Sequence, residues 1–235
     1  MHHSLVLCTF SDALQDCRRH TLSLLPSTEQ NADVLDAQLL NTQLLNTQAH
    51  SDFSPVGWHL GHIAYTESLW IAEHLGGLLS QFPDALSAEE RTHWKKLFAA
   101  DGLPKSERQN LPSLAALLAY LEKVRSHTLR HLEQFGSSGT ERLWHWLIQH
   151  ESQHAETIAM VLAMHQLNQQ KAEVGNSDLP EVTLGSSTET AADSEMMFFA
   201  AGEVLQGYDG PEAIDNECPA HRSWVEDFWL DRPPT

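Results

Sequence analysis

The sequence predicts a mainly α-helical protein, in which a four-helix bundle over residues 5–168 is followed by a linker and the start of an α+β domain. Apolar residues recur at helical spacing through most of the first 170 residues. Residues 169–194 are rich in Glu, Ser, Thr, Asp and Gly without a periodic pattern, which is typical of a linker. Residues 195–235 contain two short segments that resemble strands.

Five helical segments are predicted from apolar spacing and from residues that begin or end helices. Their expected bounds are Phe10 to Leu25, Ser54 to Gly76, Ser87 to Ala100, Ser113 to Phe135, and Thr140 to about Asn168. Ser54 followed by Pro55 suits a helix start, and Gly76-Gly77 suits a stop. The pentapeptide LLNTQ occurs at 39–43 and again at 44–48, and we interpret it as a loop or a solvated helical turn.

The C-terminal segment contains two strand signals. MMFFAAGEVLQG predicts a strand and a turn, and the alternation of Trp224, Val225, Phe228 and Leu230 predicts a second strand. Two strands cannot bury a core alone. We therefore expect this segment either to dock on the bundle or to begin a domain whose remainder is absent.

Composition excludes several classes of partner. The chain has 235 residues with 14 Lys and Arg against 32 Asp and Glu, a formal charge of −18. Nucleic acids and anionic membranes need a basic surface, so neither is expected as a partner. The three cysteines do not form a disulfide framework, the N-terminus does not resemble a signal peptide, and no apolar run approaches the length of a membrane span. A cytoplasmic protein is predicted.

Two histidines four residues apart indicate a possible metal site. His150 to His154 matches the H-E-x-x-H pattern of zinc proteases, in which Glu151 would be the general base. A protease of that type needs a third ligand downstream, usually on the next helix. Here Met164-His165 is followed by the linker, where Glu173 and Glu181 are poor candidates. On a helix, His150 and His154 share an apolar face. Burying two imidazoles on such a face requires partners, which are either a shared metal or backbone and carboxylate groups.

A third ligand in a bundle is expected from another helix. His62 lies on an apolar face with Trp58, Tyr65 and Leu69. His59 lies about 60–100° off that face and is interpreted as a boundary residue or a supporting group. Three neutral histidines suit Zn²⁺ or Fe²⁺, and spacing alone does not choose between them.

Three separated segments resemble one enzyme family. SPVGWHLGHIAYTESLW and HWLIQHESQHAETIAMVL are similar to the two signature segments of the DinB-like domain of ergothioneine-biosynthesis sulfoxide synthases. FFAAGEVLQGYDG and DNECPAHRSWVEDFWLDRPPT resemble the opening of the formylglycine-generating-enzyme-like, C-type-lectin-like domain that follows in that family. The resemblance covers nearly the whole chain in the right order.

The resemblance implies a mononuclear non-haem Fe²⁺ enzyme. Such enzymes use O₂ to join a cysteine-containing thiol to the imidazole C2 of trimethylhistidine, and they oxidise the sulfur. The family's iron-binding histidines fall on His62, His150 and His154. With these roles, Glu151 becomes a supporting or helix-face residue rather than a base.

The resemblance also implies substrate contacts. The glutamine that reaches the substrate imidazole falls on Gln153, and the basic pair for the carboxylates of the thiol falls on Lys105 and Arg108 in PKSERQNLP, with Lys in place of one Arg. Glu67 and Glu156 are interpreted either as acceptors for the distal N–H groups of ligand imidazoles or as surface carboxylates.

The family's catalytic tyrosine lies in a part of the lectin-like domain that cannot be placed in this sequence. The chain is therefore interpreted as a truncated version, a fragment, or one half of a split enzyme with a separately encoded lectin-like partner. Two alternatives remain. One is a zinc-dependent DinB-like thiol transferase or isomerase, against which residues 196–235 argue, and the other is a non-catalytic metal-binding bundle.

Overall fold

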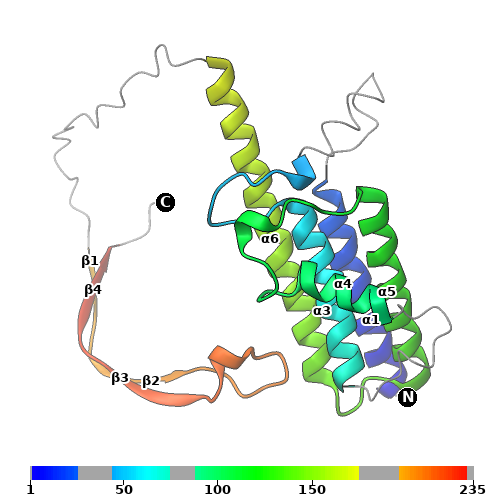
Figure 1. Ribbon diagram of the computed structural model, residues 1–235. Coiled ribbons are helices and arrows are strands. Elements are labelled where there is room, and N and C mark those ends of the chain that lie inside the picture. The colour runs from blue at the N-terminus through cyan, green and yellow to red at the C-terminus, as the bar shows by residue number, and fades with distance from the viewer. Residues whose placement is uncertain (1, 26–43, 75–87, 175–195, 232–235) are drawn as a thin grey trace. The chain divides into compact units, whose positions relative to one another are not determined.

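The computed structural model describes residues 2–25, 44–74, 88–174 and 196–231 (Figure 1). The chain divides into a helical unit, Met1–Glu173, and a β unit, Val174–Thr235. Among the described helices, none combines the length and apolar character needed to span a membrane.

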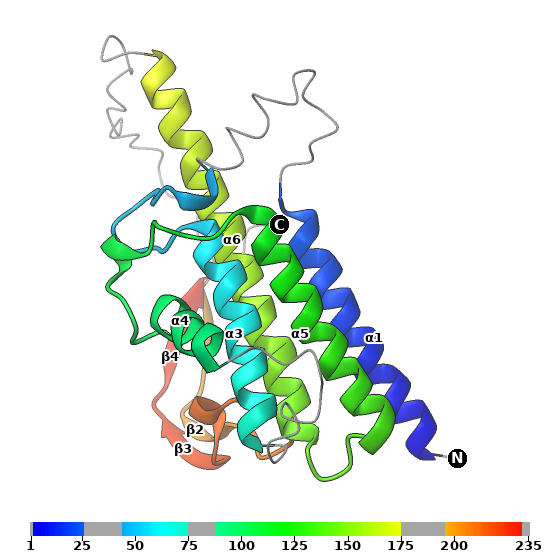
Figure 2. The same ribbon diagram turned by 45° about the vertical axis from the view of Figure 1, so that its right-hand side comes forward.

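Four long helices of the helical unit lie side by side (Figures 1 and 2). They are α1 (His2–Ser23), α3 (Val56–His74), α5 (Leu114–Phe135) and α6 (Glu141–Val174). The shorter α4 (Ala88–Phe98) packs against α3, and a 3₁₀ turn, η3 (Lys105–Glu107), lies between α4 and α5. The mainly helical fold predicted from the sequence is confirmed.

Local signals account for the helix bounds. Ser113 caps α5 by accepting a hydrogen bond from the N–H of Ala116, and Gly136 ends it at a φ of 78°, which glycine adopts without strain. The carbonyl of Pro55 accepts the N–H of Trp58 at 3.0 Å in the first turn of α3. The second LLNTQ copy begins with a helical turn at 44–46, whereas the first copy lies outside the described residues.

Helix α6 is longer than predicted. Residues 169–174, which we expected to belong to the linker, continue the helix. Their side chains are mainly Gln, Lys, Ala and Glu, which favour helices. Residues 166–172 are exposed, so this part of the helix has no apolar face to mark it in the sequence. The rest of the predicted linker, 175–194, lies outside the described residues.

The apolar core runs between the long helices. One cluster joins α3, α5 and α6, and a second joins α1, α3, α5 and α6 near the other end of α3. Fully buried members of the two clusters include Leu60, Ile63, Leu121, Ile158 and Val161 in the first, and Leu14, Leu132 and Trp144 in the second. These clusters fix the facing sides of α3 and α6, on which the predicted metal ligands lie.

The β unit is an interrupted antiparallel ribbon. Its strands are β1 (Met196–Phe199), β2 (Gly202–Gln206), β3 (His221–Val225) and β4 (Phe228–Asp231), with β2 paired to β3 and β1 to β4. Each of the two predicted strand segments is therefore two strands. Large apolar side chains are exposed on the ribbon, including Leu205 at 70% and Trp229 at 58%. This exposure agrees with the expectation that two strand segments cannot bury a core alone.

Candidate metal centre

The structure brings the three predicted histidines together. His62 lies on α3, and His150 and His154 lie one turn apart on α6. One nitrogen atom of each imidazole lies within 4.8 Å of the corresponding atoms of the other two. A group of this size and composition can hold one metal ion.

His62 is oriented by the last residue of α4. Its Nδ1 lies 2.7 Å from the carbonyl oxygen of Phe98. A carbonyl only accepts, so Nδ1 carries the proton and Nε2 keeps its lone pair. That Nε2 lies 3.3 Å from Nε2 of His150. The close approach of α4 depends on Gly61, because a Cβ there would lie 2.1 Å from the Phe98 ring.

Two tryptophans hold the imidazole rings in place. Trp58 stacks on His62 with ring centroids 4.6 Å apart, and Trp146 stacks on His150 at 4.9 Å. The indole N–H of Trp58 donates to the carbonyl of Leu97 at 2.9 Å, which fixes the ring. Sequence reasoning placed Trp58 beside His62 but missed Trp146. Its position four residues before His150 on the same helix is the signal that could have found it.

The three imidazoles are kept neutral by their surroundings. Burial lowers the pKa of His62. Burial, followed by the neighbouring His62, lowers the pKa of His150 to about 3, and burial, followed by His150, lowers that of His154 to about 2. Neutral imidazole is the form that binds metals. The donor set therefore fits a resident Fe²⁺ or Zn²⁺ ion.

His59 belongs to the same cluster, which the helical angle alone did not predict. Its Nδ1 lies 2.9 Å from Nδ1 of His154, and only 6% of the residue is exposed. Burial, and then the neighbouring His62, lowers the pKa of His59 to about 4. The interpretation as a boundary residue is therefore wrong, whereas a supporting group fits the geometry.

Two of the three predicted substrate residues, Gln153 and Lys105, lie at the surface. Gln153 is exposed and directly precedes His154 on α6. The Nζ of Lys105 donates to the carbonyl of Asp52 at 2.6 Å. Neither side chain is held in the core.

Arg108 is buried, with 6% exposure. Its guanidinium donates to the carbonyls of Leu103 and Ala100 and to the hydroxyl of Ser54. It also lies 4.0 Å from the centroid of the Trp58 ring, on which His62 stacks. In this structure Arg108 therefore supports the Trp58 ring, which in turn stacks on His62 of the metal centre.

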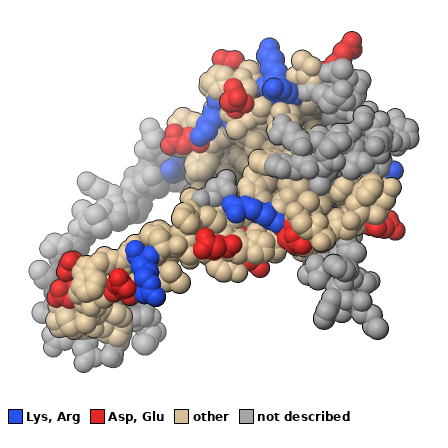
Figure 3. Space-filling model, turned by 90° about the horizontal axis from the view of Figure 1, so that it is seen from below, with Lys and Arg blue, Asp and Glu red and all other residues tan. Residues whose placement is uncertain are grey.

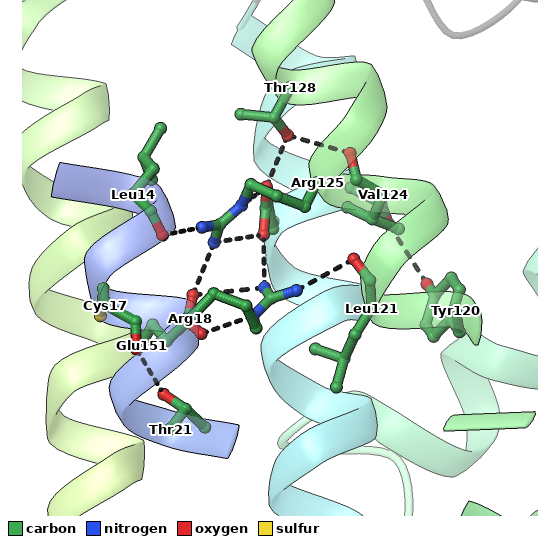
Figure 4. A network of polar contacts seen from close by, with 12 residues as sticks. Leu14, Cys17, Arg18, Thr21, Tyr120, Leu121, Val124, Arg125, Thr128 and Glu151 are labelled. Atoms are coloured by element: carbon green, nitrogen blue, oxygen red, sulfur yellow. Dashed lines mark hydrogen bonds and ion pairs between the residues drawn. The ribbon is translucent and has the colours of Figure 1, made fainter. Parts of the chain in front are cut away.

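A buried network of charges lies beside the centre (Figure 4). Glu151 accepts from Arg18 Nε at 2.6 Å and from Arg125 Nη2 at 2.6 Å, while Glu67 accepts from Arg18 Nη2 at 3.1 Å, from Arg125 Nε at 2.9 Å and from Thr128. The four charged groups come one each from α1, α3, α5 and α6. They balance to zero net charge.

The network excludes the surface interpretation of Glu67 and the protease role that the H-E-x-x-H pattern would give Glu151. Glu151 and Glu67 are 1% and 2% exposed, so neither is a surface carboxylate, and Glu151 is bound to two arginines rather than free to act as the base of a zinc protease. Glu156 is exposed, as the surface interpretation predicted. Sequence reasoning missed Arg18 and Arg125, whose presence among apolar helix positions was the available signal.

The charged surface agrees with the acidic composition. On the described residues of the face in Figure 3, basic side chains are separated by acidic and uncharged ones rather than gathered into one patch. The sequence supplies 14 basic against 32 acidic residues.

Comparison with known proteins shows where similar sequences occur. Residues 13–158 match the DinB superfamily. The chain is 28% identical over 183 residues to a hercynine oxygenase of Mycolicibacterium thermoresistibile, and 30% identical over 186 residues to a hercynine oxygenase of Mycobacterium tuberculosis. Both matches cover 77% of this chain, but only 38% and 40% of the respective relatives. The chain thus spans about two fifths of the length of these relatives.

Proposed function

This chain belongs to the DinB superfamily, and we propose on that basis that it forms the metal-binding part of an oxygenase acting on hercynine, which is trimethylhistidine. The observation that supports this most directly is the group of three imidazoles within 4.8 Å of one another, inside the segment that matches the family. We further propose that the four long helices form a DinB-like four-helix bundle around this group.

His62, His150 and His154 would hold Fe²⁺ through neutral imidazole nitrogens. Three protein ligands leave coordination positions for other molecules, and a bound Fe²⁺ ion would supply a redox-active site for chemistry with O₂, with the electrons that reduce O₂ coming from the thiol and trimethylhistidine. The chain's own contribution is orientation. Phe98 fixes the proton of His62 on Nδ1, and Trp146 supports the ring of His150.

The substrates of this proposal are trimethylhistidine, a cysteine-containing thiol and O₂, as in a sulfoxide synthase. Gln153, next to His154, would contact the imidazole of trimethylhistidine. Lys105 and Arg108 would contact the carboxylates of the thiol. To contact a carboxylate, Lys105 would give up its hydrogen bond to the backbone carbonyl of Asp52. Arg108 would have to exchange one of its present carbonyl acceptors for the carboxylate.

The β unit would begin a C-type-lectin-like domain. Its support is the exposure of side chains such as Phe198 and Trp229 on a ribbon too small to cover them. We propose that further lectin-like sequence, separately encoded or continuous with this chain, covers the ribbon and supplies the catalytic tyrosine of the family.

Metal content, anaerobic Fe²⁺ titration and O₂ uptake test the proposal. One equivalent of Fe²⁺ is expected, with O₂ uptake that depends on trimethylhistidine and a thiol when the lectin-like part is supplied. His62→Ala should abolish tight binding. His93→Ala, which removes an exposed histidine of α4, should leave the stoichiometry unchanged and serves as the control.

Two outcomes would contradict the proposal. Equal Fe²⁺ affinity in His62→Ala and wild type would show that His62 is not a ligand and would contradict the proposed three-histidine metal centre. Tight Zn²⁺ binding without substrate-dependent O₂ uptake would instead favour a thiol transferase or isomerase, for which three neutral imidazoles are equally suitable.

A further inference from the structure

The contact between His59 and His154 constrains where protons sit. The two Nδ1 atoms are 2.9 Å apart, so one of them donates and the other accepts. His59 lies on α3, one turn before His62, and its ring is buried. Its Nε2 is also buried and has no hydrogen-bond partner among the described residues.

The arrangement leaves one nitrogen of His154 for a metal. Because Nδ1 of His154 faces His59, Nε2 is the atom left to join His62 and His150. A neutral imidazole that binds a metal through Nε2 carries its proton on Nδ1. That proton needs an acceptor, and Nδ1 of His59 is the atom within reach. His59 must then carry its own proton on Nε2.

We propose that His59 is a positioning residue, which accepts the Nδ1 proton of His154 and so keeps Nε2 of His154 directed at the metal. This inference rests on the proposed function, since it requires the three-histidine site to bind a metal. It adds a fourth histidine that acts through His154 without touching the ion. Ligand imidazoles in proteins are commonly held by such an acceptor, and its loss typically costs about 10- to 100-fold in metal affinity.

A matched pair of variants separates this role from packing. His59→Asn places an amide oxygen two bonds beyond Cβ, as Nδ1 is in histidine, so it retains an acceptor for His154. His59→Leu has the same branching without an acceptor. The control is His131→Leu, which replaces another buried histidine that has an unpaired ring nitrogen in the described structure but lies on α5 among Phe135 and Trp144.

The measurement is the Zn²⁺ dissociation constant of the full chain, by competition with a chelator. His59→Leu should bind about 10- to 100-fold more weakly than wild type, whereas His59→Asn and His131→Leu should stay within about threefold. Equal affinities for His59→Leu and wild type would overturn the positioning role and leave the metal site intact. Equal losses in the Leu and Asn variants would also overturn it, because packing alone would explain them. A wild-type protein that binds no metal would overturn the proposed function itself.

Imidazole ¹⁵N NMR of the Zn²⁺-loaded protein supplies a second readout, since Zn²⁺ is diamagnetic. The expected spectrum has His154 protonated at Nδ1 and His59 protonated at Nε2. A spectrum with the His59 proton on Nδ1 would contradict the proposal even if affinity fell, because His59 would then be the donor.

Discussion

Replacement of Glu151 by Gln tests whether the buried charge network stabilises the helical unit. The substitution keeps the shape of the side chain and removes its charge. Glu151 is 1% exposed and accepts hydrogen bonds from Arg18 and Arg125 at 2.6 Å each. In the variant, two buried guanidinium groups share the single carboxylate of Glu67, which leaves one positive charge unbalanced.

The expected loss of unfolding free energy is about 3 kcal/mol. Removing one partner of a buried ion pair costs about 3–5 kcal/mol, because the remaining charge stays buried. The amide oxygen of Gln still accepts one hydrogen bond, so we expect the lower end of that range. With a urea dependence of about 2 kcal/mol per M, the unfolding midpoint should fall by about 1.5 M.

Urea unfolding of the metal-free chain, followed by circular dichroism of the helices, measures this shift. Metal-free protein is used so that the stability of the metal centre does not contribute. Glu156→Gln is the control, since Glu156 is exposed on the same helix and should shift the midpoint by less than about 0.3 M. A shift as small as this for Glu151→Gln would refute the reasoning that the network stabilises the fold.

Three further predictions concern pH and packing. Burial raises the pKa of Glu67, but its two arginine partners outweigh burial and hold the folded-state pKa below 4.5. The network should therefore stabilise the protein above pH 4.5, and this contribution should be lost as the pH falls further. Urea unfolding midpoints between pH 7 and 3 check this. The pKa values of about 3 for His150 and about 2 for His154 mean that the unfolded chain takes up protons below pH 6.5 that the folded site does not. The metal-free protein should therefore lose stability as the pH falls below 6.5, and Zn²⁺ affinity should fall less than about tenfold between pH 7 and 5.5; a steeper fall would contradict neutral ligands. Gly61→Ala should destabilise the chain by about 1–3 kcal/mol because its Cβ would meet the Phe98 ring, and an unchanged thermal midpoint would contradict this.

Sequence reasoning predicted the features that depend on local pattern. The α5 helix begins after Ser113 and ends before Gly136, as capping and the glycine indicate. The three histidines meet because each lies on the apolar face of its helix. These predictions needed only helical periodicity and the expectation that apolar faces pack together.

Features that depend on distant partners were not predictable in the same way. Glu151 pairs with Arg18, 133 residues earlier in the chain, so the local sequence offered only the role of a base or of a supporting or helix-face residue. His59 was assigned by helical angle to a boundary, but the ring of His154 reaches it from α6. The end of α6 was missed because its last turns are exposed and their sequence shows no apolar face.

The H-E-x-x-H match has a physical explanation that differs from protease chemistry. Adjacent residues on a helix point about 100° apart, so His150 and Glu151 face different neighbours. The histidines face α3, where His62 lies, while Glu151 faces the arginines of α1 and α5. On α3, Glu67 turns similarly away from His62 towards the same arginines. The charge network thereby fixes the rotation of both helices that carry the imidazoles. A rotation of α6 that released Glu151 to act as a base would also carry its histidines away from His62.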